Sequence, residues 1–132
     1  MCLVINKKET TKLKKKVKYI IGYKVYVKNT YHLQAPYRTH HCVSKYGVVK
    51  SNREKQKIDS YERMKNRVYR GIHIFRDGLT ADVMRDHMYP NTGRVVKVRC
   101  YLKDLVAADE NQAVFMKVTI LKAEWSKIFG TT

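Results

Sequence analysis

Hydrophobic and polar positions alternate most regularly over residues 17–28. Every second residue from Val17 onward is aliphatic or aromatic, whereas three of the six positions between them are lysine. Alternation with a period of two is typical of a β-strand that buries one of its faces. We therefore expect a half-buried strand over 17–28.

Shorter patterns predict further strands. Residues 95–101 are expected to form a strand with one apolar and one polar face. The apolar face carries Val96, Val98 and Cys100, and the polar face carries Lys97, Arg99 and Tyr101. Residues 113–124 predict one long strand, with Val114, Met116, Val118 and Ile120 on one face. Apolar runs predict short strands at 2–5, 42–49 (interrupted by Gly47) and 71–75, and a short apolar piece at 104–107.

Helical periodicity is clearest over residues 79–88. Val83 and Met88 fall on one side of such a helix, and Thr80 can cap its first turn. Pro90 ends it, because proline cannot continue a helix. We therefore predict an amphipathic helix in this segment.

The most basic segments are harder to interpret. Residues 52–70 fit an amphipathic helix, and an ordered loop fits them equally well. The residues that recur there at helical spacing are Ile58, Tyr61, Met64 and Val68. Residues 7–16 are expected to form a basic connection, and residues 125–132 a loosely packed tail.

Together these elements predict an α+β fold in a single domain spanning residues 1–132. We expect an antiparallel β-sheet of about five or six strands with one or two helices packed on one face. No apolar window approaches the roughly 18 residues that a membrane-spanning helix needs. The first residues run from apolar to positive, the reverse of a secretory signal, so we expect a cytoplasmic protein that does not engage a membrane.

The charge balance points to anionic partners. Lysine and arginine total 28 against 11 aspartate and glutamate, so the formal net charge is +17. The cations are concentrated in three stretches, at 7–18, 50–70 and 94–99. A field of this size attracts polyanions, and its uneven distribution favours a binding face. A solvated lysine-rich surface without a binding role is the alternative.

Ten tyrosines are interleaved with the basic residues. An exposed ring can stack on a nucleobase while a neighbouring cation holds its phosphate, and arginine can do so through two parallel hydrogen bonds. The predicted ligand-binding residues are Tyr37, Arg38, Tyr69, Arg70, His73, Lys97, Arg99 and Tyr101. Packing in a small core or a dimer interface is the alternative for any one tyrosine.

Signatures of catalysis and of metal binding are weak. His40 and Cys42 would share one face of a strand, but two ligands do not make a zinc site. The sequence contains no Walker loop, no glycine-rich dinucleotide motif and no nucleophile–histidine signature. We therefore predict a protein without catalytic activity, cofactor or metal. A nucleotide-processing enzyme with His73 or His41 as its base is the alternative.

Several short motifs together resemble one group of proteins. In chain order they are Met1-Cys2-Leu3, Tyr23-Lys24-Val25, Ala35-Pro36-Tyr37, Gly71-Ile72-His73-Ile74-Phe75, Asp104-Leu105-Val106-Ala107 and Ala113-Val114-Phe115. The combination resembles a family of small uncharacterised accessory proteins of bacteriophages and their bacterial hosts, in which serine is usual at the position of Ala35. The resemblance covers most of the chain. It implies a phage accessory protein akin to counter-defence factors, some of which sequester nucleotide immune signals.

We therefore expect a basic binding protein of phage type that captures a phosphate-containing ligand in the host cytoplasm. A nucleotide immune signal and a nucleic acid both satisfy the charge. A protein-interaction module that inhibits an acidic host protein or serves in the virion is the alternative. A homodimer is also expected, because exposed sheet edges pair readily.

Overall fold

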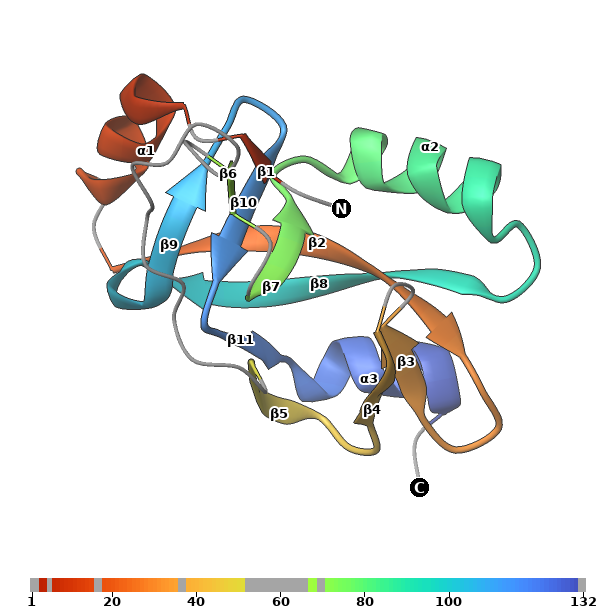
Figure 1. Cartoon of the computed structure of the whole chain (residues 1–132). Helices are drawn as coiled ribbons and strands as arrows, with labels where there is room; N and C mark the ends of the chain where they lie inside the picture. The colour runs from red at the N-terminus through yellow and green to blue at the C-terminus, as the bar shows by residue number, and fades with distance from the viewer. Residues whose placement is uncertain are drawn as a thin grey trace.

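The structure is a computed structural model that describes residues 3–4, 6–15, 18–35, 38–51, 67–68 and 71–130. Within these residues it confirms an α+β fold, with a mostly antiparallel open sheet and three α-helices (Figure 1). The sheet has nine strands, which is more than the sequence predicts. Two short strands, β1 (Leu3–Val4) and β6 (Arg67–Val68), form a separate antiparallel pair.

The centre of the sheet is a long ladder between β2 (Tyr19–Lys28) and β8 (Gly93–Tyr101), which run side by side across the molecule in Figure 1. Their antiparallel register is continuous over nine residue pairs, starting with Tyr19 opposite Tyr101. Both segments were predicted as strands from their alternation and are confirmed as strands, with small shifts at their ends. In β2, however, the core side carries Gly22 and Tyr26, whereas Tyr19 and Ile21 of the more apolar side are exposed.

The remaining strands attach to the two edges of this ladder. The order across the sheet is β5 (Gly47–Lys50), β11 (Lys117–Ile120), β8, β2, β7 (Ile72–Phe75), β10 (Gln112–Phe115) and β9 (Leu105–Ala108). The sheet also branches at the end of β2, which pairs with β3 (Leu33–Ala35), and β3 in turn pairs with β4 (Arg38–Val43).

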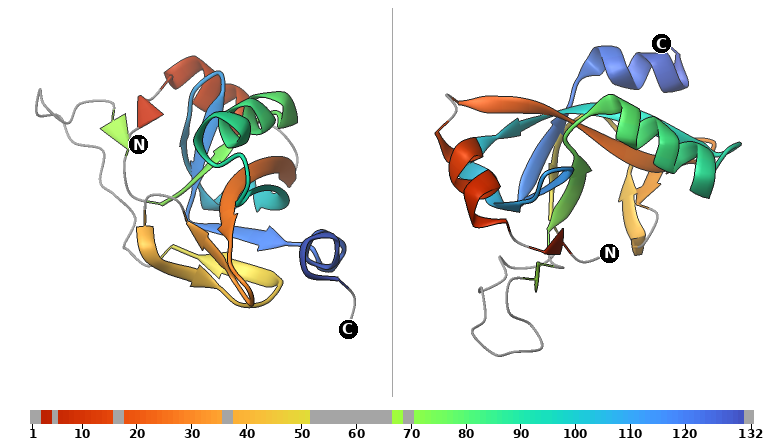
Figure 2. Two further views of the ribbon diagram at one scale, coloured as in Figure 1. Left: turned by 90° about the vertical axis from the view of Figure 1, so that its right-hand side faces the viewer. Right: turned by 90° about the horizontal axis from the view of Figure 1, so that it is seen from above.

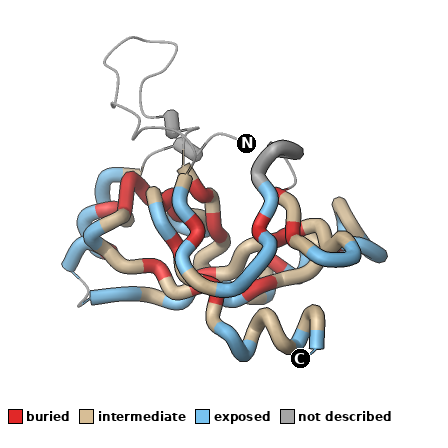
Figure 3. Tube along the Cα trace, turned by 90° about the horizontal axis from the view of Figure 1, so that it is seen from below, coloured by how far each residue is buried: buried red, intermediate tan, exposed pale blue. Residues whose placement is uncertain are grey.

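One face of the ladder forms the core. Gly22 and Tyr26 of β2 and Val96 and Val98 of β8 point to this side and are buried. Figure 3 shows the buried residues gathered in the strands, whereas the C-terminal helix is half-buried or exposed along its length. The opposite face of β2 begins with Tyr19, which is exposed. The start of β2 therefore turns hydrophobic side chains towards solvent.

The predicted helix over 79–88 is confirmed as α2 (Gly78–Met88), although its cap is Asp77 and not Thr80. Asp77 Oδ1 accepts a hydrogen bond from the Thr80 N–H at 2.7 Å, and this bond lowers the pKa of Asp77. The helix starts against the ring of Tyr23, on the outward face of β2. Seen from above in Figure 2, α2 crosses one end of the β2–β8 ladder. It leaves the other end uncovered.

The prediction of a single long strand over 113–124 is wrong, because the chain pairs with different strands before and after Met116. β10 pairs with β7 and β9, whereas β11 pairs with β8 and β5. At the break, the Met116 N–H donates to the Asp104 carbonyl, and the Met116 carbonyl accepts from Ser51 N–H. Alternation continues through such a break, so it cannot show where one strand ends and the next begins. The strand predicted over 42–49 is likewise divided between β4 and β5.

The basic connection predicted over 7–16 is also wrong, since it contains α1 (Lys7–Lys14). Asn6 caps this helix by accepting a hydrogen bond from the Glu9 N–H at 3.1 Å. Thr10 and Leu13, three residues apart, are its buried positions. Two buried residues are too few to produce a clear pattern in a lysine-rich segment.

The tail predicted over 125–132 is not loose up to Phe129, because it continues α3 (Lys122–Phe129). The rings of Trp125 and Phe129 lie 4.5 Å apart and pack against the core. The segment predicted as helix or loop over 52–70 lies outside the described residues, apart from the backbone of β6.

α3 also covers an edge of β8. Beyond the point where β11 pairs with β8, the Lys97 N–H donates to Glu124 Oε1 at 3.1 Å. Partial burial raises the pKa of Glu124, but hydrogen bonds from Lys127 and from the Lys97 N–H lower it overall. A charged side chain thus takes the place of a neighbouring strand.

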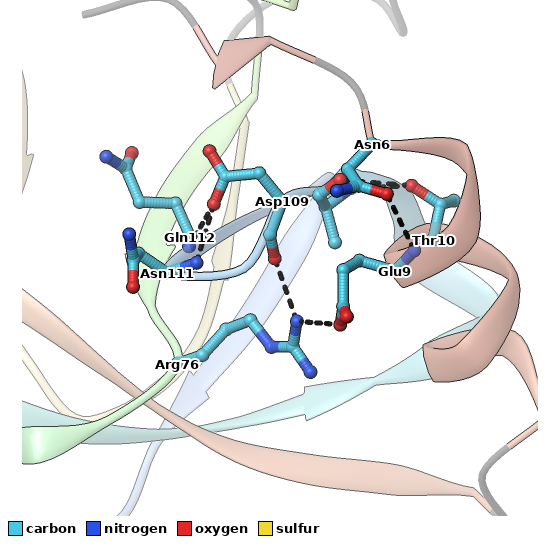
Figure 4. A network of polar contacts seen from close by, with 8 residues as sticks. Asn6, Glu9, Thr10, Arg76, Asp109, Asn111 and Gln112 are labelled. Atoms are coloured by element: carbon cyan, nitrogen blue, oxygen red, sulfur yellow. Dashed lines mark hydrogen bonds and ion pairs between the residues drawn. The ribbon is translucent and has the colours of Figure 1, made fainter.

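A polar network ties α1 to the β9–β10 hairpin (Figure 4). Arg76 Nη1 donates to Glu9 Oε2 at 2.7 Å and to the Asp109 carbonyl at 2.8 Å. The Thr10 hydroxyl donates to the Ala108 carbonyl at 3.2 Å and accepts from the Ala108 N–H at 3.0 Å. The hydrogen bond from Arg76 lowers the pKa of Glu9.

Glu9→Gln is expected to reduce the free energy of unfolding at neutral pH, because Arg76 loses its charged partner. Since the pKa of Glu9 is lowered by folding, the stabilisation is complete above the unfolded-state pKa and is lost as the pH falls through the folded-state pKa. Urea unfolding of both proteins, from neutral pH to well below the ordinary glutamate pKa of about 4.3, tests this. A stability difference that stays constant to the acid end would contradict the expectation.

Gly22→Ala is expected to destabilise the protein by about 1–3 kcal/mol through overpacking. A Cβ at Gly22 would collide with Ile74 Cδ1 and lie 3.3 Å from Cys100 Sγ, and both neighbours are buried. Ile74→Val removes the colliding atom, so the double variant should lose less stability than the sum of the single variants. Thermal unfolding of the four proteins measures this coupling, and strictly additive losses would refute it.

Candidate functional site

The outward face of four neighbouring strands remains open beside α2. The register places these residues on the same side of the sheet: Tyr19 and Ile21 of β2, Lys97, Arg99 and Tyr101 of β8, Lys117 and Thr119 of β11, and Val48 and Lys50 of β5. We call this set the open sheet face. It combines tyrosine, lysine and arginine on a regular strand surface.

The open sheet face has an aromatic and a cationic corner. Tyr19 lies opposite Tyr101 on β2 and β8, and Lys117 lies opposite Lys50 on β11 and β5. The adjacent row across the four strands consists of Ile21, Arg99, Thr119 and Val48. Lys97 lies one further row along β8. Arg99 is therefore central to the face.

Hydrophobic side chains of the open sheet face are accessible to solvent. The exposed fraction is 42% for Tyr19, 37% for Ile21 and 62% for Val48. The lysines at positions 50, 97 and 117 are exposed as well. Tyr19 and Ile21 lie side by side on β2, and Val48 lies at the opposite edge of the face. Exposed hydrophobic side chains bordered by charge are typical of a contact surface.

Arg99 is held by an aromatic ring and keeps unused donors. Its guanidinium carbon lies 4.9 Å from the centre of the Tyr19 ring, which is a cation–π contact. The rings of Tyr19 and Tyr101 meet edge to face, with centroids 5.9 Å apart and an interplanar angle of 62°. Arg99 Nε is buried and has no hydrogen-bond partner among the described residues. A buried donor without an acceptor is unusual in a native fold.

Within the part of the chain that the structure describes, no carboxylate forms an ion pair with a cation of the open sheet face. The described ion pairs are Arg76 with Glu9, Arg85 with Asp86, and Lys127 with Glu124. Lys50 and Lys117 instead face each other across neighbouring strands, an arrangement that destabilises a sheet. A bound anion would neutralise this local excess of positive charge.

The structure brings three of the predicted ligand-binding residues together on the open sheet face, namely Lys97, Arg99 and Tyr101. It does not bring His73 to them. His73 is half-buried in β7, which lies on the other side of β2 from β8, and its Nδ1 is 3.4 Å from the Gly71 carbonyl. The remaining predictions lie outside what the structure describes: Tyr37, Tyr69, Arg70 and the side chain of Arg38, whose backbone belongs to β4.

Sequence reasoning missed the residues that β2, β5 and β11 contribute to this face. A signal for two of them was present, because Lys117 and Thr119 alternate with the buried Val118 and Ile120. Nothing local in the sequence shows that β11 lies between β8 and β5. The pairing of distant strands is therefore what assembles the face.

Among the described residues, no three histidine, cysteine or acidic side chains are placed to hold a metal ion. Burial raises the pKa of the Cys100 thiol to about 12. This thiol therefore stays protonated and unreactive at neutral pH. His32 Nε2 lies 3.0 Å from Asn29 Nδ2 in the turn between β2 and β3.

None of the described helices has the length and apolar character needed to cross a membrane. Comparison with protein-family models, with curated proteins and with solved structures returned no match to this chain.

Lys117→Glu is expected to stabilise the fold by about 0.2–1 kcal/mol, because it replaces a like-charge pair with Lys50 by a pair of opposite charge. Urea unfolding at low ionic strength measures the gain, which should shrink in high salt because the pair is exposed. Lys14→Glu, which makes the same change in net charge on α1, is the control. Equal stabilisation by both variants would show that total charge, and not the pair, is responsible.

Proposed function

We propose that this protein is a non-catalytic binding protein that captures a phosphate-containing ligand on the open sheet face. The environment of Arg99 carries the proposal: its guanidinium stacks on Tyr19 in the middle of the open sheet face, and no described carboxylate forms an ion pair with it. A phosphate group offers several acceptor oxygens, and arginine can bind it through two parallel hydrogen bonds.

Other residues of the open sheet face can bind the base and the further charges of a phosphate-containing ligand. The accessible surface of Tyr19 and the neighbouring ring of Tyr101 can stack on a planar base, which contributes about 1–3 kcal/mol per base. Thr119 adds a hydroxyl that donates or accepts. The lysines at positions 50, 97 and 117 add charge that favours encounter with an anion. A nucleotide signal and a nucleic acid share this combination of planar base and phosphate.

Short motifs of this chain resemble those of phage accessory proteins. This resemblance supports the idea that the protein acts inside a bacterial host during phage infection. A basic protein that captures a nucleotide immune signal or a nucleic acid in the host cytoplasm would act in counter-defence. In this proposal the ligand is bound and not converted.

Exposed aliphatic side chains favour a second candidate ligand, an acidic protein surface. Ile21 and Val48 lie in the same row as Arg99 and are both exposed. Protein interfaces combine such apolar contacts with arginine. A module of this kind would inhibit an acidic host protein or serve in the virion. A complex that survives nuclease treatment would identify it.

Native mass spectrometry of protein purified at low and at high salt tests the first proposal. Low-salt material is expected to carry a phosphate-containing compound that high salt removes. Arg99→Ala should lose most of the bound compound, because the central donor is missing.

The matched control is Lys14→Ala on α1, which removes one exposed cation away from the open sheet face and should bind like the wild type. Circular dichroism establishes that each variant is folded. Wild-type protein that carries no phosphate compound at low salt and binds neither added nucleotides nor nucleic acid would contradict the proposal.

A further inference from the structure

We propose that the ligand of the open sheet face is a single strand of nucleic acid several nucleotides long. This inference rests on the proposed function and narrows its ligand from any phosphate compound to one class. Three properties of the face support it: the spread of its cations, its openness, and the position of its aromatic rings.

The cations are spread too widely for one phosphate. By register, Lys97 and Lys50 lie two strands and two rows apart, which is about 16 Å at ~4.8 Å between strands and ~3.3 Å per residue. Side chains of a strand stand roughly perpendicular to the sheet, so the charges stay apart. Arg99 and Lys117 lie between these ends. A row of phosphates can reach all four cations, whereas a single phosphate cannot.

The length of this path sets the size of the ligand. A stacked strand advances ~3.4 Å per nucleotide, so about five nucleotides cover the distance from Lys97 to Lys50. This length is near the lower end of the range of about 4–16 nucleotides known for single-strand-binding folds.

The openness of the face also disfavours a small ligand. Sites for small molecules are concave and enclose about 70–90% of the ligand. Tyr19, Ile21 and Val48 instead project from a strand surface and are accessible to solvent. A base stacked on Tyr19 would leave its other side open, and in a nucleic acid strand the next base can cover that side.

The tyrosines distinguish a single strand from a duplex. Stacking on Tyr19 or Tyr101 requires a base that is free of its partner strand. The aromatic corner lies on β2 and β8, and the cationic corner on β11 and β5. A strand can place bases over the first and phosphates over the second, with Arg99 in the adjacent row of the sheet. A duplex would offer only its phosphates.

Fluorescence anisotropy with labelled oligothymidylates and oligouridylates, from the mononucleotide to a dodecamer, tests the inference on the full chain. Affinity is expected to rise with length up to about five nucleotides and then to level off. Three or four phosphate contacts predict a slope of about −2 to −3 in a plot of log affinity against log salt. A duplex dodecamer should bind more weakly than the single strand.

Variants connect the binding to the named residues. Tyr19→Ala should weaken binding of the dodecamer roughly 5- to 150-fold, while Tyr19→Phe, which keeps the ring, should retain it. Tyr31→Ala is the matched control, because Tyr31 is 82% exposed in the turn after β2, outside the open sheet face. It should bind like the wild type.

Each failure has a distinct meaning. A mononucleotide that binds as tightly as the dodecamer would overturn this inference and leave the proposed function standing. Equal affinity for the duplex, or equal losses in Tyr19→Ala and Tyr31→Ala, would also overturn it. Absence of binding to every nucleotide and nucleic acid would overturn the proposed function as well.

Discussion

The continuous register between β2 and β8 is the constraint on which the rest of the structure depends. Because side chains alternate along a strand, a shift by one residue would turn Gly22 and Val98 outward and drive Arg99 into the core. The buried cluster therefore holds the register, and the register in turn holds Arg99 beside Tyr19. Of the elements around the open sheet face, β11 and α2 contact this ladder directly, and β5 joins it through β11.

Charge is distributed unevenly over this framework. The cation that links α1 to the segment after β7 has a carboxylate partner, since Arg76 pairs with Glu9. On the open sheet face, Arg99 lies against the Tyr19 ring and Lys50 lies opposite Lys117, whereas Lys97 lies close enough to Glu124 to lower the pKa of its carboxyl. The fold tolerates this repulsion, although a single acidic residue on β5 or β11 would relieve it. An excess of one charge on a face attracts molecules of the opposite charge.

The elements that could be predicted are those whose hydrophobic pattern is complete within one segment of the sequence. β2, β8 and α2 follow from alternation or helical spacing, and Lys97, Arg99 and Tyr101 follow from alternation within a single strand. The break at Met116 and the contributions of Lys50 and Lys117 depend on which strands pair, and no local pattern contains that information. α1 was missed because its lysine-rich sequence resembles that of a solvated segment. The helix is stabilised mainly by contacts of Thr10 and Leu13 with residues far away in the sequence, and no local pattern shows these contacts.

The long separation of β2 and β8 along the chain has a consequence during synthesis. β2 leaves the ribosome while most of the chain, including its partner β8, is still to be made, so neither of its faces is covered for that time. Strands exposed in this way are prone to associate with other chains, and charged residues within them oppose this. Lys18, Lys24 and Lys28 in and beside β2 are spaced to provide such protection. The basic character that suits the finished surface can thus also keep the nascent chain apart from its neighbours.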